Sequence, residues 1–115
     1  MRKKNTIEIV CNLIKDYSKE QIIFTKKDKL AWLCKRNNTT VDKMQDEILS
    51  LNNLESVESQ EVEHLGEKEK RFRCYFLYSN SKGRCYVLKF DEKIRVITVF
   101  PLGRLTLRKY RKKFK

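Results

Sequence analysis

Residues 22–57, IIFTKKDKLAWLCKRNNTTVDKMQDEILSLNNLESV, carry the clearest structural pattern of the chain. A short apolar run at Ile22–Phe24 is followed by a helical segment that is expected to be capped by Thr25, with Leu30 and Ala31 facing inward early in it, and that ends in a polar turn. Thr40 opens a second helical segment, whose apolar residues recur at helical spacing: Val41, Met44, Ile48 and Leu51. Asn52 and Asn53 stand where a helix needs a left-handed terminating residue. The pattern therefore predicts helix, turn, helix and then a strand.

This pattern resembles the helix-turn-helix of winged-helix nucleic-acid-binding proteins. In that family a positioning helix with a Leu-Ala pair precedes a turn and a recognition helix that opens with Thr-Val. The matching pairs here are Leu30-Ala31 and Thr40-Val41, and the resemblance covers residues 7–77, about two thirds of the chain. It implies DNA binding through Asn37, Asn38, Thr39, Thr40 and Lys43 of the turn and second helix, with Arg71 and Arg73 reaching from a β wing.

The second helix differs in charge from a groove-binding helix. It carries Asp42, Asp46 and Glu47 against the single Lys43, a balance that suits contact with phosphates poorly. We therefore expect modest sequence specificity, with affinity supplied mostly by Lys and Arg elsewhere in the chain.

Positive charge is concentrated at the end of the sequence. The chain has 27 Lys and Arg against 15 Asp and Glu, a net charge of +12, and residues 101–115 contribute seven basic and no acidic side chains. This distribution favours a polyanionic partner, most simply DNA or RNA, over a merely solubilising Lys-rich surface. The winged-helix resemblance implies DNA rather than RNA. Basic residues interleaved with an aromatic suit phosphate contact and base stacking, and the candidates are Arg104, Arg108, Lys109, Tyr110, Arg111 and Lys112.

The flanking segments complete an α+β fold. Residues 6–17 predict an amphipathic helix, with Ile7, Val10, Cys11, Ile14 and Tyr17 along one face. Extended runs at 54–62, 72–78, 84–90 and 94–100, with a polar turn over 64–70, predict an antiparallel meander of about four strands. We therefore expect a three-helix, winged-helix-like unit with an extended sheet as one domain over 1–100, and a basic tail over 101–115. The hairpin at 83–100 either extends the wing or completes a different sheet.

Several classes of site have no support in the sequence. Cys11, Cys34, Cys74 and Cys85 form no C-x-x-C pair and lie in apolar contexts, which favours buried thiols in a reducing compartment over a disulfide or metal site. We expect no cofactor and no membrane segment, since no apolar run approaches the roughly 18 residues of a membrane span. A cytoplasmic protein is expected, with a homodimer through a sheet edge or the first helix as an option. Trp32 is expected to be partly buried, with stacking on nucleic acid as the minor alternative.

Two alternatives remain open. The C-terminal part resembles the RelE-type ribonuclease toxins, with Tyr86-Val-Leu-Lys and Arg95-Val-Ile-Thr-Val-Phe on late strands and Gly103-Arg104 beyond them. In that interpretation Arg84, Arg104, Arg108 and Tyr110 supply charge and a proton carrier for RNA cleavage, although no well-placed histidine is present. The other alternative is a non-enzymatic protein-interaction module with a basic tail.

Overall fold

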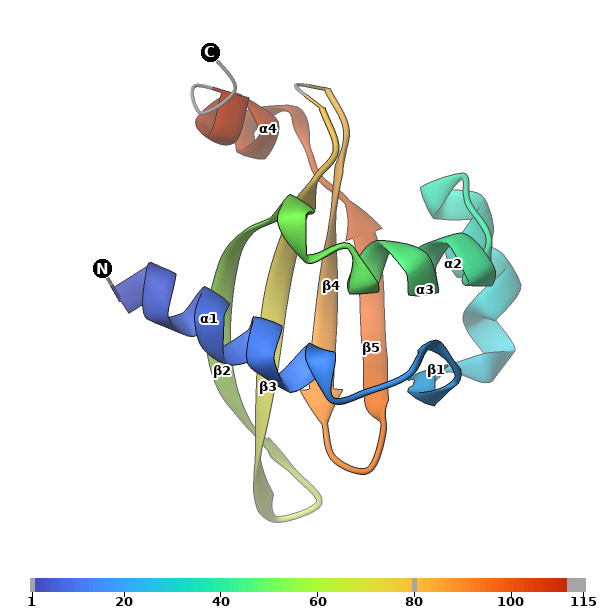
Figure 1. Cartoon of the computed structure of the whole chain (residues 1–115). Helices are drawn as coiled ribbons and strands as arrows, with labels where there is room; N and C mark the ends of the chain where they lie inside the picture. Colours follow the sequence, from blue (N-terminus) through green and yellow to red (C-terminus); the bar gives the residue numbers. More distant parts are fainter. Residues whose placement is uncertain (1, 80, 112–115) are drawn as a thin grey trace.

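The structure, a computed structural model, describes residues 2–79 and 81–111, and the side chains of 6–79 and 81–109. Over these residues the fold is α+β, with four α-helices and one five-stranded mixed sheet (Figure 1). The elements in chain order are α1 (Arg2–Lys15), β1 (Ile22–Phe24), α2 (Leu30–Asn37), α3 (Val41–Leu49), β2 (Leu54–His64), β3 (Glu67–Leu77), β4 (Gly83–Phe90), β5 (Ile94–Pro101) and α4 (Arg104–Arg111). Short 3₁₀ turns occupy Lys19–Gln21, Lys27–Lys29 and Leu51–Asn53. None of the described helices is long and apolar enough to cross a membrane.

The strand order is β1-β5-β4-β3-β2. Strands β2 to β5 form the predicted antiparallel meander, and β1 adds a fifth strand that pairs in parallel with β5, Ile22 opposite Ile94. The hairpin over 83–100 therefore lies between β3 and β1, in the middle of the sheet. It neither lengthens the β2–β3 hairpin nor forms a sheet of its own.

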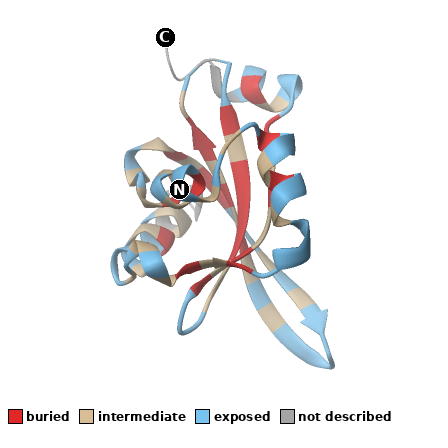
Figure 2. Cartoon of the chain, turned by 90° about the vertical axis from the view of Figure 1, so that its right-hand side faces the viewer, coloured by how far each residue is buried: buried red, intermediate tan, exposed pale blue. Residues whose placement is uncertain are grey.

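One face of the sheet and the first three helices enclose the main core. Val10 and Ile14 of α1, Leu33 of α2, and Met44 and Ile48 of α3 pack with alternate strand residues. The strand residues in this core are Ile22, Phe24, Leu54, Val57, Phe72, Cys74, Phe76, Tyr86, Leu88, Ile94, Val96 and Val99. Figure 2 shows the buried residues concentrated along the strands, while the β2–β3 end projects and is exposed. The predicted apolar face of α1 is confirmed.

A smaller cluster holds α4 against the sheet. Leu102 and Leu107 pack with Leu77 and Cys85. Because side chains alternate along a strand, Cys85 points to the face opposite that of Tyr86, so α4 covers one end of the second face. Part of the predicted tail is thus a helix docked on the sheet.

Three local predictions were wrong. The left-handed helix end is not at Asn52 or Asn53 but at Asn38, with φ of 51°, directly after α2. The polar turn over 64–70 is reduced to two residues, because residues 67–70 continue β3 as partners of β2. The third concerns α2, which begins at Leu30 and not after a Thr25 cap, since the Thr25 hydroxyl donates to the Val96 carbonyl oxygen. Leu30 is half-buried and Ala31 is exposed, so the Leu-Ala pair does not face inward, and Leu33 is the buried apolar residue of this helix.

The cysteine prediction agrees with the structure where it is described. Cys74 and Cys85 are buried, and Cys11 and Cys34 are half-buried, all as free thiols. In the β3–β4 register Cys74 is opposite Tyr86 and Cys85 is opposite Tyr75, so the two buried thiols are not cross-strand partners. Burial raises the pKa of both, that of Cys85 to about 12, which leaves them protonated and unreactive.

Candidate functional site

A groove of about 510 Å³ opens where the α2–α3 turn meets the start of β4. We call it the turn groove; its walls include Arg36, Asn38, Thr39 and Lys43 on the helical side, and Tyr78, Lys82 and Arg84 on the side of the sheet. The backbone of Asn38 in the left-handed region reverses the chain after α2. The Thr40 hydroxyl then accepts a hydrogen bond from the Lys43 amide at 3.2 Å and caps α3.

The predicted contact residues of the turn separate into two kinds. Asn38, Thr39 and Lys43 line the groove. Asn37 is only 4% exposed, and its side-chain amide donates to the carbonyl oxygens of Leu33 and Val99, so its side chain ties α2 to β5. Thr40 is exposed but serves as the α3 cap.

A charged cluster forms the wall between α3 and β4. The Arg84 guanidinium donates to the Glu47 carboxylate at 2.5 Å and to the Asn37 carbonyl oxygen at 2.7 Å. The Tyr86 hydroxyl donates to the other Glu47 oxygen, and burial raises the pKa of Tyr86. Both carboxylate oxygens of Glu47 are thus engaged within the fold, which leaves this carboxylate poorly placed to accept a proton from a substrate.

The remaining charges around the turn groove are basic. Arg36, Lys43 and Lys82 border it, and among the described side chains none of the three makes an ion pair. Glu47 is neutralised by Arg84. Besides Arg36, the segment 26–37, which includes α2, adds four basic side chains against one acidic. An anion entering the groove therefore meets an excess of positive charge.

Trp32 adjoins the groove through Arg36. Its side chain is 55% exposed, and the Arg36 guanidinium lies 5.2 Å from the ring centroid. The sequence prediction of partial burial missed this arrangement. The i, i+4 spacing of Trp32 and Arg36 on α2 is the signal from which it follows.

The predicted wing has a different charge. The β2–β3 arm, residues 54–77, carries six acidic and four basic side chains. Opposite charges face each other across its strands, Glu58 with Arg73, Glu61 with Lys70 and Glu63 with Lys68. The Arg73 side chain is half-buried. The arm therefore has a net charge of −2, which opposes contact with a phosphate backbone.

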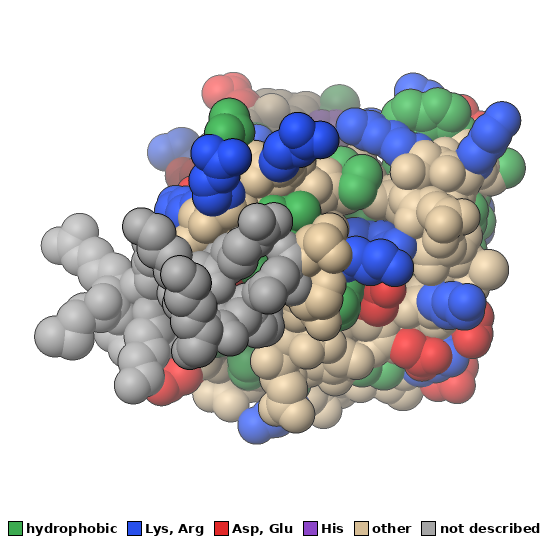
Figure 3. All heavy atoms as spheres, turned by 90° about the horizontal axis from the view of Figure 1, so that it is seen from above, with side chains coloured by type: hydrophobic (Ala, Val, Ile, Leu, Met, Phe, Trp, Pro, Cys, Tyr) green, Lys and Arg blue, Asp and Glu red, His purple; other side chains and the backbone are tan. Residues whose placement is uncertain are grey.

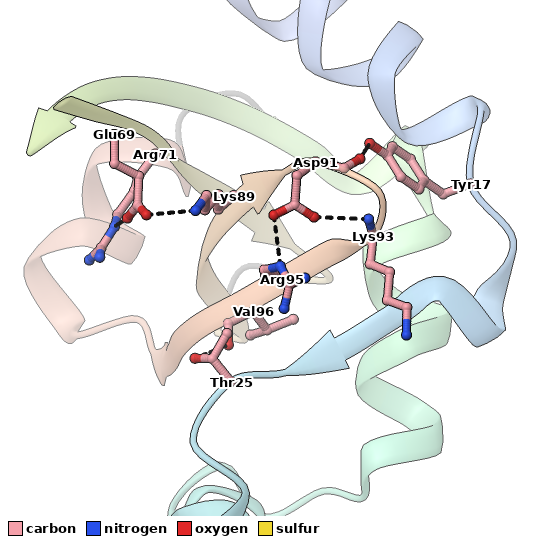
Figure 4. A network of polar contacts seen from close by, with 9 residues as sticks. All are labelled: Tyr17, Thr25, Glu69, Arg71, Lys89, Asp91, Lys93, Arg95 and Val96. Carbon is pink, nitrogen blue, oxygen red and sulfur yellow. Dashed lines mark hydrogen bonds and ion pairs between the residues drawn. The ribbon is translucent and has the colours of Figure 1, made fainter. Parts of the chain in front are cut away.

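Arg71 is part of a paired network on the second face of the sheet (Figure 4). Glu69 accepts from Arg71 at 2.6 Å and from Lys89 at 2.7 Å, and these hydrogen bonds, that of Lys89 foremost, lower the pKa of Glu69. Arg95 donates to Asp91 at 2.7 Å. Arg71, Lys89 and Arg95 are thus matched by carboxylates, in contrast to the cations of the turn groove.

The exposed side of α3 is acidic as well. Asp42 and Asp46 are both exposed, and Lys19 of the first 3₁₀ turn bridges them at 2.6 and 2.9 Å. Lys43 faces the turn groove instead. The helix that the family resemblance would place in a DNA groove thus presents carboxylates to solvent.

The C-terminal candidates from Arg104 to Arg111 lie on α4. Arg104, Arg108 and Lys109 are exposed, and the buried Leu107 fixes the helix beneath them. The side chains of Tyr110 and Arg111, and the whole of Lys112, lie outside the described residues. Figure 3 looks onto this end of the molecule, where Lys and Arg side chains are spread across the upper half of the view and a group of carboxylates lies at the lower right.

The residues of the ribonuclease alternative are distributed over two places. Arg84 lies in the turn groove, paired with Glu47, whereas Arg104 and Arg108 lie on α4. His64 is exposed at the end of the β2–β3 arm. Comparison with protein-family models, with curated proteins and with solved structures found no match to this chain.

Proposed function

We propose that this chain binds nucleic acid without cleaving it and holds phosphates with Lys and Arg of α2, the turn groove and α4. The observation that carries the proposal is the turn groove, where Arg36, Lys43 and Lys82 border one concave site and no described carboxylate pairs with them. Basic side chains that no carboxylate neutralises can neutralise phosphates and release their counterions, and this release supplies much of the affinity of proteins for nucleic acid.

In this proposal α1, α2 and α3 act as a winged-helix-like unit that binds DNA. The turn between α2 and α3 has the features of a helix-turn-helix, a left-handed Asn38 and a Thr40 cap. Because α3 and the β2–β3 arm each carry a net charge of −2, the phosphate contacts shift to α2 and the groove. Modest sequence specificity follows, since phosphate contacts carry no base information.

The test is a fluorescence-anisotropy titration of a labelled DNA duplex over a range of salt concentrations. One variant removes the groove charges, Arg36→Gln, Lys43→Gln and Lys82→Gln. A matched control loses the same charge elsewhere on the surface, Lys15→Gln, Lys68→Gln and Lys93→Gln. We expect the groove variant to lower the slope of log affinity against log salt by about 3, because each phosphate contact contributes about 1. The control should keep most of the wild-type slope.

Three outcomes would overturn the proposal. Wild-type protein that binds neither duplex nor single-stranded nucleic acid would favour the protein-interaction alternative. Equal losses in the groove and control variants would mean that net charge alone attracts the polyanion. Incubation with RNA tests the enzyme alternative directly, because cut RNA with loss of cleavage in Arg104→Ala would favour the ribonuclease.

A further inference from the structure

An exposed aromatic ring lies beside the basic groove. Trp32 is the single tryptophan of the chain and is 55% exposed, although tryptophan is buried to a large extent on average in folded proteins. The Arg36 guanidinium lies 5.2 Å from its ring centroid. An indole ring next to a guanidinium plane is the kind of surface on which unpaired bases stack.

Arg36 connects this ring to the turn groove. It contacts Trp32 on α2 and also lines the groove with Lys43 and Lys82. The groove volume of about 510 Å³ is within the range of pockets that hold one small ligand. A site of this size accommodates a nucleotide of a flexible strand, whereas the bases of a duplex are held inside their stack.

The two surfaces that a winged-helix protein would place against a DNA duplex, α3 and the β2–β3 arm, are acidic, whereas the turn groove is basic. Asp42 and Asp46 are exposed on α3, and the β2–β3 arm has a net charge of −2. A helix inserted into the major groove lies between two phosphate backbones, which repel carboxylates. The basic surface and the exposed aromatic ring therefore coincide on α2 and its groove, away from the acidic side of α3.

We propose that the preferred ligand of this site is single-stranded nucleic acid, with a base stacked on Trp32 and the adjoining phosphates on Arg36, Lys43 and Lys82. This inference rests on the proposed function and narrows its ligand class. The site combines the two parts that sequence-tolerant single-strand binding requires, a positively charged groove for the backbone and an aromatic side chain for the bases.

The single tryptophan makes the test direct. Short oligothymidylate, short oligouridylate and a DNA duplex of equal length are titrated into the whole protein, and both Trp32 fluorescence and anisotropy of the labelled nucleic acid are recorded. We expect quenching of Trp32 and tighter binding with the single strands than with the duplex. Oligothymidylate and oligouridylate distinguish DNA from RNA, because only the latter offers 2′-hydroxyl groups.

Variants separate stacking from charge. Trp32→Leu should weaken single-strand binding by roughly 5- to 100-fold, the range for loss of one stacked base, and Trp32→Phe should retain part of the affinity. Ile9→Ala on α1, where the side chain is 54% exposed, is the matched control and should bind as the wild type does. Far-UV circular dichroism checks that each variant is folded.

The outcomes distinguish the two proposals. Tighter binding of the duplex, with unchanged Trp32 fluorescence and no effect of Trp32→Leu, would overturn this inference and leave the proposed function standing. Failure to bind any of the three nucleic acids would overturn both. Single-strand binding that is indifferent to Trp32→Leu would remove the stacking role and refute the inference as stated.

Discussion

Glu47 of α3 and Arg84 of β4 are 37 residues apart in sequence, yet their side chains meet at 2.5 Å in the wall of the turn groove. The pair joins the helical layer to the sheet. The Tyr86 hydroxyl donates a hydrogen bond to the second carboxylate oxygen of Glu47. Both side chains are mostly shielded from solvent, so the interaction is worth more than an ion pair on the surface.

Glu47→Gln should lower the free energy of unfolding by about 2 kcal/mol, because Arg84 then remains shielded without its counter-charge. Urea denaturation followed by circular dichroism measures the change. Asp46→Asn on the same helix is the control: its ion pair with Lys19 is exposed, and its loss should cost less than about 1 kcal/mol. Equal effects of the two variants would contradict a special role for the Glu47–Arg84 pair.

Gly83→Ala should destabilise the docking of α4. A Cβ atom at Gly83 would lie 2.8 Å from Leu102 Cδ1 and 2.8 Å from the Phe76 carbonyl oxygen, so backbone must move. We expect a loss of about 1–3 kcal/mol in the free energy of unfolding and faster hydrogen exchange of the α4 amides. Gly103→Ala, where the added Cβ meets nothing within 4 Å, is the control and should cost less, since only the preference for Gly over Ala before a helix is lost. Unchanged exchange in Gly83→Ala would show that Leu102 does not anchor the helix.

Leu65→Asn should stabilise the protein. Leu65 lies in the left-handed region with φ of 53°, and its side chain is 91% exposed, so the strain is not offset by burial. Asn tolerates this conformation and is favoured before Gly in a two-residue hairpin turn, and we expect a gain of about 1 kcal/mol. The denaturation midpoint measures it. A decrease in stability would mean that Leu65 makes apolar contacts in solution.

Acid should weaken the network around Glu69. Hydrogen bonds from Lys89 and Arg71 hold the pKa of Glu69 below its ordinary value of 4.5. A carboxyl whose pKa is lower in the folded state contributes stability above the unfolded pKa and loses it as pH falls through the folded pKa. The stability difference between wild type and Glu69→Gln should therefore shrink once pH falls below 4.5.

Chemical denaturation at a series of pH values measures this difference. Glu61→Gln is the control, because the exposed Glu61 carboxylate is 3.8 Å from Lys68 and solvent screens the pair. A pH-independent difference for Glu69→Gln would contradict the assignment of Glu69 to this network.

The elements that could be predicted are those whose apolar residues recur at a clear helical or strand spacing. The apolar face of α1 and the runs at 84–90 and 94–100 appear in the structure close to their predicted limits. The first residues of β3 escaped prediction because Glu67 to Lys70 are charged, and their strand conformation depends on pairing with the acidic β2. The parallel partnership of β1 with β5 was equally invisible, since three apolar residues carry no information about their distant neighbour.

The candidate site was predictable only where local turn chemistry controls it. Asn38, Thr39 and Lys43 line the groove as components of the α2–α3 turn. Lys82 and Arg84 lie about forty residues further along the sequence, just before and within β4. They reach the α2–α3 turn only through the tertiary fold. The burial of Asn37 follows from its bond to Val99 on β5, again a contact between distant parts of the chain.

The parallel pairing of β1 with β5 also sets the order in which the molecule assembles. Phe24 pairs with Val96, so β1 can join the sheet only after the chain has left the ribosome as far as β5. Until then the apolar sides of α1, α2 and α3 have no complete sheet to pack against. Contacts between residues so distant in sequence slow folding. The helical half is consequently not a module that can be excised, and a chain ending before β5 is expected to be a target for chaperones and proteases.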